Sequence, residues 1–244
     1  MRIMVVLPTA KGVYPAEAEQ RRIDRCLSYS TPTTTVEVGF PAERSGFSPM
    51  SRGGEANAFD LAANHMRIAE RMIQAEQEGF DACVPFGMID FGIEIARSRC
   101  KIPIVGQTQA TYAIAATMAN HWGVISYRSG GHSMMRRQAH AYGFDPWIIG
   151  WGAAEMSNAE MPSRRTELFE RFVSEGKRLA ALGAELIVCH GMSMCPIEYS
   201  AEEYTEAIGV PVVEGLGCGI AFAEALVRLG TPYSKVRYPS AARE

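Results

Sequence analysis

Residues 79–94 read GFDACVPFGMIDFGIE, and residues 183–198 read GAELIVCHGMSMCPIE. Aligned without gaps, the two stretches share positions that include Gly79 with Gly183, Gly87 with Gly191, Met88 with Met192 and Glu94 with Glu198. Each copy is a short apolar run that ends at a Gly-Met pair, a pattern typical of a buried strand followed by a turn. The simplest cause of such a match is a repeat of the fold itself.

A second apolar run follows each copy, IPIVG at 102–106 and VPVVEG at 210–215. A strand, a crossover and a parallel strand form the unit that this order predicts. Parallel sheets of α/β proteins bind ligands outside the carboxyl ends of their strands. We therefore predict an α/β fold of two pseudo-symmetric Rossmann-like domains. Each has a parallel four-stranded sheet flanked by helices, and the active site lies between them.

The remaining periodicity completes the two halves. The predicted first domain comprises residues 1–107 plus 217–244, and the second comprises residues 108–216. Further strands are expected at 2–8, 33–40, 121–128 and 146–151, and helices at 17–27, 60–79, 108–120, 129–142, 163–182 and 216–229. The polar, Gly- and Pro-containing connection at 41–59 is long and is typical of a lid or binding loop.

Composition excludes several classes of function. The 244 residues carry a net charge of -3 without a basic stripe or polybasic patch, so no nucleic acid and no membrane surface is expected as a partner. No apolar run approaches the ~20 residues of a spanning helix, so we expect neither a membrane-spanning helix nor a secretory signal. We expect a cytoplasmic protein with a small-molecule substrate, six cysteines present as thiols, and a possible homo-oligomeric state.

The chain resembles the aspartate/glutamate/hydantoin racemase superfamily. The resemblance is carried by RIMVVLP, EGFDACVPFG, LGAELIVCHGM and the closing GVPVVEGLGCGIAFAEALVRLG, which is most similar to hydantoin racemases. The opening VLPTAKGVYPAE, Tyr127 and Gly87 are more similar to the arylmalonate decarboxylase and maleate isomerase branch. The resemblance implies an interfacial active site, no metal, no organic cofactor, and cysteine thiols that move a proton at a carbon next to a carboxylate or carbonyl.

The family pattern places one cysteine eight residues beyond the glycine that precedes each repeat strand. The same count here reaches Gly87 and Gly191. Matching Cys-x-Gly-Met instead recovers Cys189 in the second copy, while the first copy still has no thiol. Because racemisation by two bases needs a group on each face of the carbon, this sequence argues against it.

We therefore predict a cofactor-independent enzyme that forms an enolate-like intermediate on a small carboxylic acid or a hydantoin-type cyclic amide. With a catalytic group on only one face of the reacting carbon, decarboxylation, elimination or isomerisation is expected rather than racemisation. One alternative is a hydrolase in which Cys189 attacks a hydantoin or thiohydantoin ring and His190 carries the proton. Another is a carboxylate-binding protein without catalysis.

Three residues are candidate catalytic groups, and each also has a structural interpretation. Cys189 is either the remaining thiol or a small buried hydrophobe. His190 is either a general base or acid, or a hydrogen-bonded polar residue at a strand end. Asp90 is either a base opposite Cys189 or a carboxylate at a helix N-terminus. Cys195, in the following turn, is a weaker candidate for the thiol.

Substrate binding is assigned to the strand ends. Gly87, Met88, Gly191 and Met192 are expected to direct backbone N–H groups at a carboxylate or oxyanion, although such glycines also serve turns that need a positive φ. The resemblance adds Tyr127, Pro8 and Thr9 to this group. A metal set of Cys189, His190, Cys195 and Cys218 lacks the usual ligand spacing. The Gly217-x-Gly219 pair falls short of a dinucleotide motif.

Overall fold

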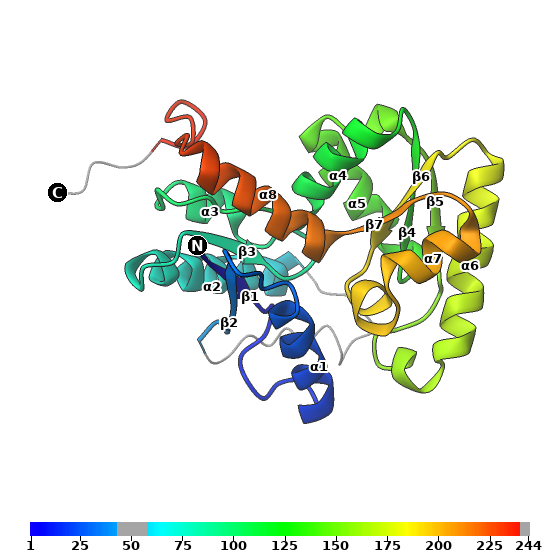
Figure 1. Ribbon diagram of the computed structural model, residues 1–244, viewed down its shortest axis with the longest axis horizontal. Coiled ribbons are helices and arrows are strands. Elements are labelled where there is room, and N and C mark those ends of the chain that lie inside the picture. The colour runs from blue at the N-terminus through cyan, green and yellow to red at the C-terminus, as the bar shows by residue number, and fades with distance from the viewer. Residues whose placement is uncertain (43–57, 240–244) are drawn as a thin grey trace. The chain divides into compact units, whose positions relative to one another are not determined.

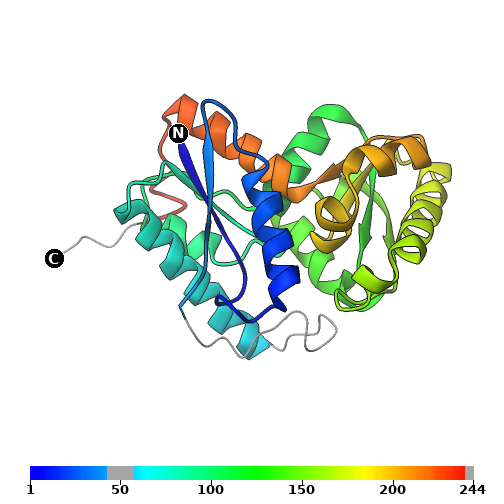
Figure 2. The same cartoon turned by 60° about the horizontal axis from the view of Figure 1, so that its bottom comes forward.

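The computed structural model describes residues 1–42 and 58–239, and the predicted lid at 41–59 lies almost wholly outside this part of the chain. The described residues form two compact units. The first unit contains residues 1–42, 58–107 and 219–239, and the second contains residues 108–218. Each unit is a parallel sheet flanked by helices, so the predicted α/β fold is confirmed (Figures 1 and 2).

The first unit is built on three parallel strands in the order β2-β1-β3. They are β1 (Arg2–Val6), β2 (Thr35–Gly39) and β3 (Ala82–Pro85). The helices are α1 (Ala16–Leu27), α2 (Ala58–Gln77), α3 (Ile93–Arg97) and most of α8 (Gly215–Leu229). Helix α2 packs on β1 and β3, and α1 contacts β2 (Figure 2). The hydroxyl of Thr34 donates to the carboxylate of Glu224, which fastens α8 to this unit.

The prediction of a fourth strand in this sheet is wrong. Residues 102–106 make one bridge, Cys83 with Ile104, in which the Cys83 N–H donates to Pro103 O and the Val105 N–H donates to Cys83 O, both at 2.9 Å. On one side of the bridge, the N–H groups of Lys101 and Ile102 are bonded to Glu76. On the other side a helix starts at Gln107. Too few residues remain between them for a longer ladder.

The second unit has the four parallel strands that were predicted, in the order β5-β4-β6-β7. They are β4 (Trp122–Ser126), β5 (Ile148–Ala153), β6 (Leu186–His190) and β7 (Val212–Glu214). The helices are α4 (Gln107–Met118), α5 (His132–Tyr142), α6 (Arg165–Ala181) and α7 (Ala201–Ile208). Short helices cover Ser129–Gly131, Asp145–Trp147, Met161–Ser163 and Ser193–Glu198.

The repeated sequences occupy equivalent places in the two sheets. Strand β3 lies between β1 and the bridge at Ile104, and β6 lies between β4 and β7. The Gly-Met pairs therefore follow the carboxyl ends of corresponding strands, as the internal repeat predicts. Within the two described ranges, no helix is both long enough and apolar enough to cross a membrane.

Candidate functional site

Strands β4 and β6 end side by side at the carboxyl edge of the second sheet, where Ser126 is paired with His190. Tyr127 directly follows β4, and Gly191 directly follows β6. A Cβ atom built on Gly191 would lie 2.6 Å from Cε1 of Tyr127, so any side chain at position 191 would collide with the tyrosine ring. Gly191 has no positive φ. The conformational explanation for this glycine is therefore wrong, and close packing explains it instead.

The Tyr127 ring is fixed by the turn that follows β6. Its hydroxyl oxygen accepts the N–H of Ser193 at 3.0 Å. The carbonyl of Gly191 accepts the N–H groups of Met194 and Cys195, both at 3.1 Å. Met192 is buried beside them. These bonds make the turn after β6 a closely packed support for Tyr127.

His190 ends β6 and is the least satisfied polar side chain at this edge. It is 3% exposed, and its Nε2 has no hydrogen-bond partner among the described residues. Burial lowers its pKa from 6.5 to about 4, with a smaller contribution from nearby His132, while a hydrogen bond to its own backbone opposes the change. At neutral pH the imidazole is therefore uncharged and able to accept a proton.

Cys189 points away from His190. Neighbouring residues of a strand face opposite sides of the sheet. Cys189 is fully buried in the core cluster that contains Phe172 and Tyr204, and its thiol donates to Gly191 O at 3.5 Å. Cys195 is buried in the same cluster. The structure thus does not bring the predicted Cys189 and His190 together on one face.

The environment of Tyr204 shows where both thiols lie. Burial raises the pKa of this tyrosine far above its usual range, and the neighbouring Cys189 and Cys195 raise it further. Its ring stacks on Phe172 with centroids 3.9 Å apart. Aromatic side chains of α6 and α7 therefore surround the two cysteines, which fits the interpretation of Cys189 as a buried small hydrophobe.

In the first unit, Gly87 follows β3 with a φ of +129°, a conformation that favours glycine. The sequence predicts that the N–H of Gly87 binds an anion. In the structure this N–H donates to Gln107 Oε1 at 2.8 Å. A Cβ atom at Gly87 would meet nothing closer than Phe91 at 3.7 Å. Unlike position 191, position 87 has space for a side chain. Met88 is buried beside it.

Asp90 is also buried and has a φ of +56°. Its carboxylate packs against Gly106, where an added Cβ would lie 2.5 Å from Oδ2. Gly106 immediately precedes α4, so the negative charge lies at the positive end of a helix dipole. This position matches the structural interpretation of Asp90, although the helix is α4 rather than the one that follows Asp90 in the chain.

Pro8 and Thr9 follow β1 and are buried inside the first unit. Burial raises the pKa of Tyr14, and the positive charge of Arg22 partly offsets that rise. The guanidinium of Arg22 lies over the Tyr14 ring at 4.5 Å. Tyr14 and Arg22 therefore form a buried contact in this part of the first unit, and Thr9 is buried in the loop after β1.

Two polar residues at strand ends, Ser126 and Glu214, were not predicted, and neither was His132 at the start of α5. Ser126 Oγ lies 3.0 Å from Nε2 of His132, which is also 3.2 Å from Gly152 O. At the end of β7, Glu214 accepts the N–H groups of Leu216 and Gly217, both at 2.6 Å, and so caps α8. Polar residues at the ends of apolar strands are the sequence signal that was available for Ser126 and Glu214.

Cation-binding groups are scarce in this site. No three His, Cys, Asp or Glu side chains of the described ranges come together in a way that could hold a metal ion.

Cys218, at the start of α8, has its pKa raised to about 12 by burial and then by Glu214. A thiol with so high a pKa keeps its proton at neutral pH.

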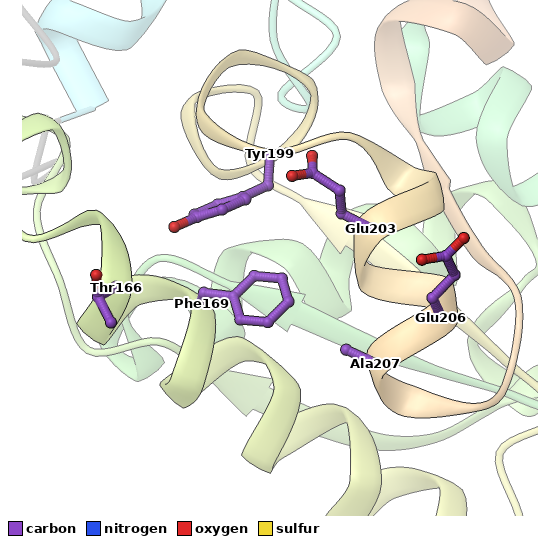
Figure 3. Close-up of a pocket in the computed structure, with 6 residues that line it drawn as sticks. All are labelled: Thr166, Phe169, Tyr199, Glu203, Glu206 and Ala207. Atoms are coloured by element: carbon purple, nitrogen blue, oxygen red, sulfur yellow. The ribbon is translucent and has the colours of Figure 1, made fainter.

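A separate groove of about 440 Å³ lies between α6 and α7 (Figure 3). Phe169 and Tyr199 line it together with Glu203 and Glu206 of α7. Glu203 accepts the Ser200 N–H at 2.7 Å, as part of the capping box of α7. None of the predicted site residues lines this groove.

The lowered pKa of His190 predicts a pH-dependent stability. Below pH 6.5 the unfolded chain binds a proton at this histidine, whereas the folded chain does so only near pH 4. Stability is therefore complete above pH 6.5, and about 3 kcal/mol is lost as the pH falls to 4. Urea unfolding of the wild type and of His190→Leu at both pH values should show a smaller acid loss in the variant. Equal losses of stability in the two proteins would show that His190 does not cause the acid sensitivity.

Comparisons with known proteins agree with this fold. The sequence matches the family model described as Asp/Glu/Hydantoin racemase over residues 22–223. A hydantoin racemase of Rhizobium meliloti is 31% identical over 242 residues, which cover 97% of this chain and 92% of that protein. Allantoin racemase from Pseudomonas fluorescens superimposes with a TM-score of 0.84 at 22% identity, over 100% of this chain and 98% of that one. Arylmalonate decarboxylase does so with a TM-score of 0.61 at 15% identity, over 95% and 94% of the two chains.

Proposed function

Because this chain belongs to the Asp/Glu/hydantoin racemase family, we propose that it is a cofactor-independent enzyme acting through an enolate-like intermediate. Its substrate is a small carboxylic acid or a hydantoin-type cyclic amide. The reaction is decarboxylation, elimination or isomerisation from one face of the reacting carbon. The membership confirms the resemblance seen in the sequence, and the hydantoin racemase relative supports an enzyme of the racemase superfamily.

The observation that carries this proposal is the presence of glycine at both positions counted for thiols. Gly191 has no space for a side chain because the Tyr127 ring lies against it. The nearby Cys189 and Cys195 are buried in the core on the α6 and α7 side. A mechanism with a thiol on each face of the carbon therefore lacks both of its groups at the expected places.

We assign the proton transfer to His190. When a C–H bond is broken, its electron pair moves into the adjacent carbonyl to form the enolate, and the proton goes to Nε2. The imidazolium form is unfavourable because the His190 ring is buried. A neighbouring enolate would offset that cost, so proton transfer becomes favourable only as the intermediate forms. Return of the proton to another atom gives isomerisation. In decarboxylation, the bond to one carboxylate breaks, carbon dioxide leaves, and the electron pair of that bond forms the enolate, which then takes a proton from water.

Two other interpretations receive less support. The hydrolase would need the Cys189 thiol beside its proton carrier His190, yet the thiol lies in the core cluster on the opposite face of β6 and donates to the carbonyl of Gly191. A carboxylate-binding protein would need free N–H groups at the strand ends, yet the N–H of Gly87 is bonded to Gln107. The position of the Cys189 thiol therefore does not favour a hydrolase, and the bonded N–H of Gly87 does not favour a binding protein.

Incubation in D₂O tests the proposal. The two enantiomers of a 5-monosubstituted hydantoin and, separately, an α-aryl malonate would be incubated, and the products would be followed by mass spectrometry and chiral chromatography. We expect deuterium incorporation with one enantiomer of the hydantoin, or decarboxylation of the malonate with a single stereochemical outcome. Equal exchange and inversion of both hydantoin enantiomers would instead establish two-sided racemisation. No reaction with any compound, despite binding, would favour the non-catalytic interpretation.

A further inference from the structure

The outermost segment of the first sheet is held by the C-terminal part of the chain. The Ile104 N–H donates to the hydroxyl oxygen of Tyr233 at 2.8 Å, and the same hydroxyl donates to Ile104 O at 2.8 Å. One side chain thus satisfies the two backbone groups that face away from β3. These groups would otherwise be free for pairing at the edge of the sheet.

Arg97 of α3 strengthens this arrangement. It is 5% exposed, its Nε donates to Ile104 O at 2.9 Å, and its Nη1 donates to the Tyr238 hydroxyl at 3.0 Å. The guanidinium lies 5.1 Å from the centre of the Tyr233 ring and 5.6 Å from that of Tyr238. A buried cation is costly unless it is paired, and here two aromatic faces and two acceptors surround it.

The held segment leads directly to the candidate site of the first unit. Gly106, two residues after Ile104, packs against the carboxylate of Asp90. Gln107 follows and accepts the N–H of Gly87 at 2.8 Å. Because the backbone between Ile104 and Gln107 is short, a shift of Ile104 is passed on to both contacts.

We propose that Tyr233 and Arg97 are positioning residues for Gly87 and Asp90. By fixing Ile104, they hold the 104–107 segment in the one register that aligns Gln107 with Gly87 and Gly106 with Asp90. The C-terminal segment, whose sequence shows no periodic pattern, is thereby part of the support of the site. This role does not depend on the reaction proposed above.

Amide hydrogen exchange, followed residue by residue by NMR, tests this role without a substrate. Tyr233→Phe keeps the ring over Arg97 but leaves the Ile104 N–H and C=O without the hydroxyl. We expect exchange at Gly87 and Val105 to accelerate by roughly tenfold, the effect of a buried hydrogen bond left unmade. The amide of Leu7, bonded to Gly39 O at the other side of the same unit, should keep its rate.

Tyr238→Phe is the matched control, because it removes a hydroxyl that contacts Arg97 but not Ile104. It should change exchange at Gly87 by less than about threefold, because Ile104 keeps both of its hydrogen bonds to Tyr233. Equal acceleration at Leu7 would reduce Tyr233 to a general stabilising role, and unchanged exchange at Gly87 in folded Tyr233→Phe would overturn the proposal. If that variant does not fold, Arg97→Met, which removes both donors, should accelerate the same two amides.

Discussion

Replacement of His190 with leucine is expected to lower turnover at least ~10²-fold, the usual contribution of a positioned proton-transfer group. Leucine fills similar space but has no lone pair to take the proton. The variant should remain folded, because it replaces a buried Nε2 that has no partner in the described part of the chain with an apolar group. Initial rates on the substrate found by deuterium exchange, with circular dichroism of both proteins, provide the measurement.

Cys189→Ala is the matched control for this prediction. It alters the adjacent residue of the same strand, but on the face that is packed against α6 and α7. We expect it to lower stability, as loss of a buried side chain does, while leaving turnover within a few-fold of wild type. Full activity in His190→Leu together with an inactive, folded Cys189→Ala would transfer the proton-carrying role to the thiol.

The second large effect is expected at Gly191. Gly191→Ala introduces a Cβ at 2.6 Å from the Tyr127 ring and 2.7 Å from Met194 Cε, so the ring must move. Overpacking of this kind costs about 1–3 kcal/mol, and Gly191→Val should cost more. The displaced ring also loses the Ser193 N–H at 3.0 Å. Thermal or urea unfolding measures the loss, and ligand titration should show weaker binding.

A double-mutant cycle identifies the cause. In a Tyr127→Ala background, Gly191→Ala should cost less by roughly 0.5–3 kcal/mol, the range found for residues in contact. Gly87→Ala is the comparison in the other copy of the repeat, where the nearest side chain is 3.7 Å away and only the φ of +129° is unfavourable. A cost at Gly191 that does not change when Tyr127 is truncated would show that the two residues are not coupled.

The sequence by itself determined the architecture. The internal repeat at 79–94 and 183–198 predicted two parallel sheets in which corresponding strands end at Gly-Met pairs, and β3 and β6 are those strands, although the first sheet has three strands and not the four predicted. This could be predicted because strand and helix periodicity is a local property of the chain. The same local patterns, compared with the family, also located His190 and both glycines at the strand ends.

Only the tertiary structure decided what these residues face. Alternation along β6 requires Cys189 and His190 to point apart, but the packing of α6 and α7 determined that the thiol is the buried one. The two positions also require glycine for different reasons. At Gly191 the ring of Tyr127, which follows β4, leaves no space for a side chain, whereas Gly87 has a positive φ. Gln107 on Gly87 and Tyr233 on Ile104 join residues far apart in sequence. Such contacts leave no periodic trace, because they depend on where packing places each side chain.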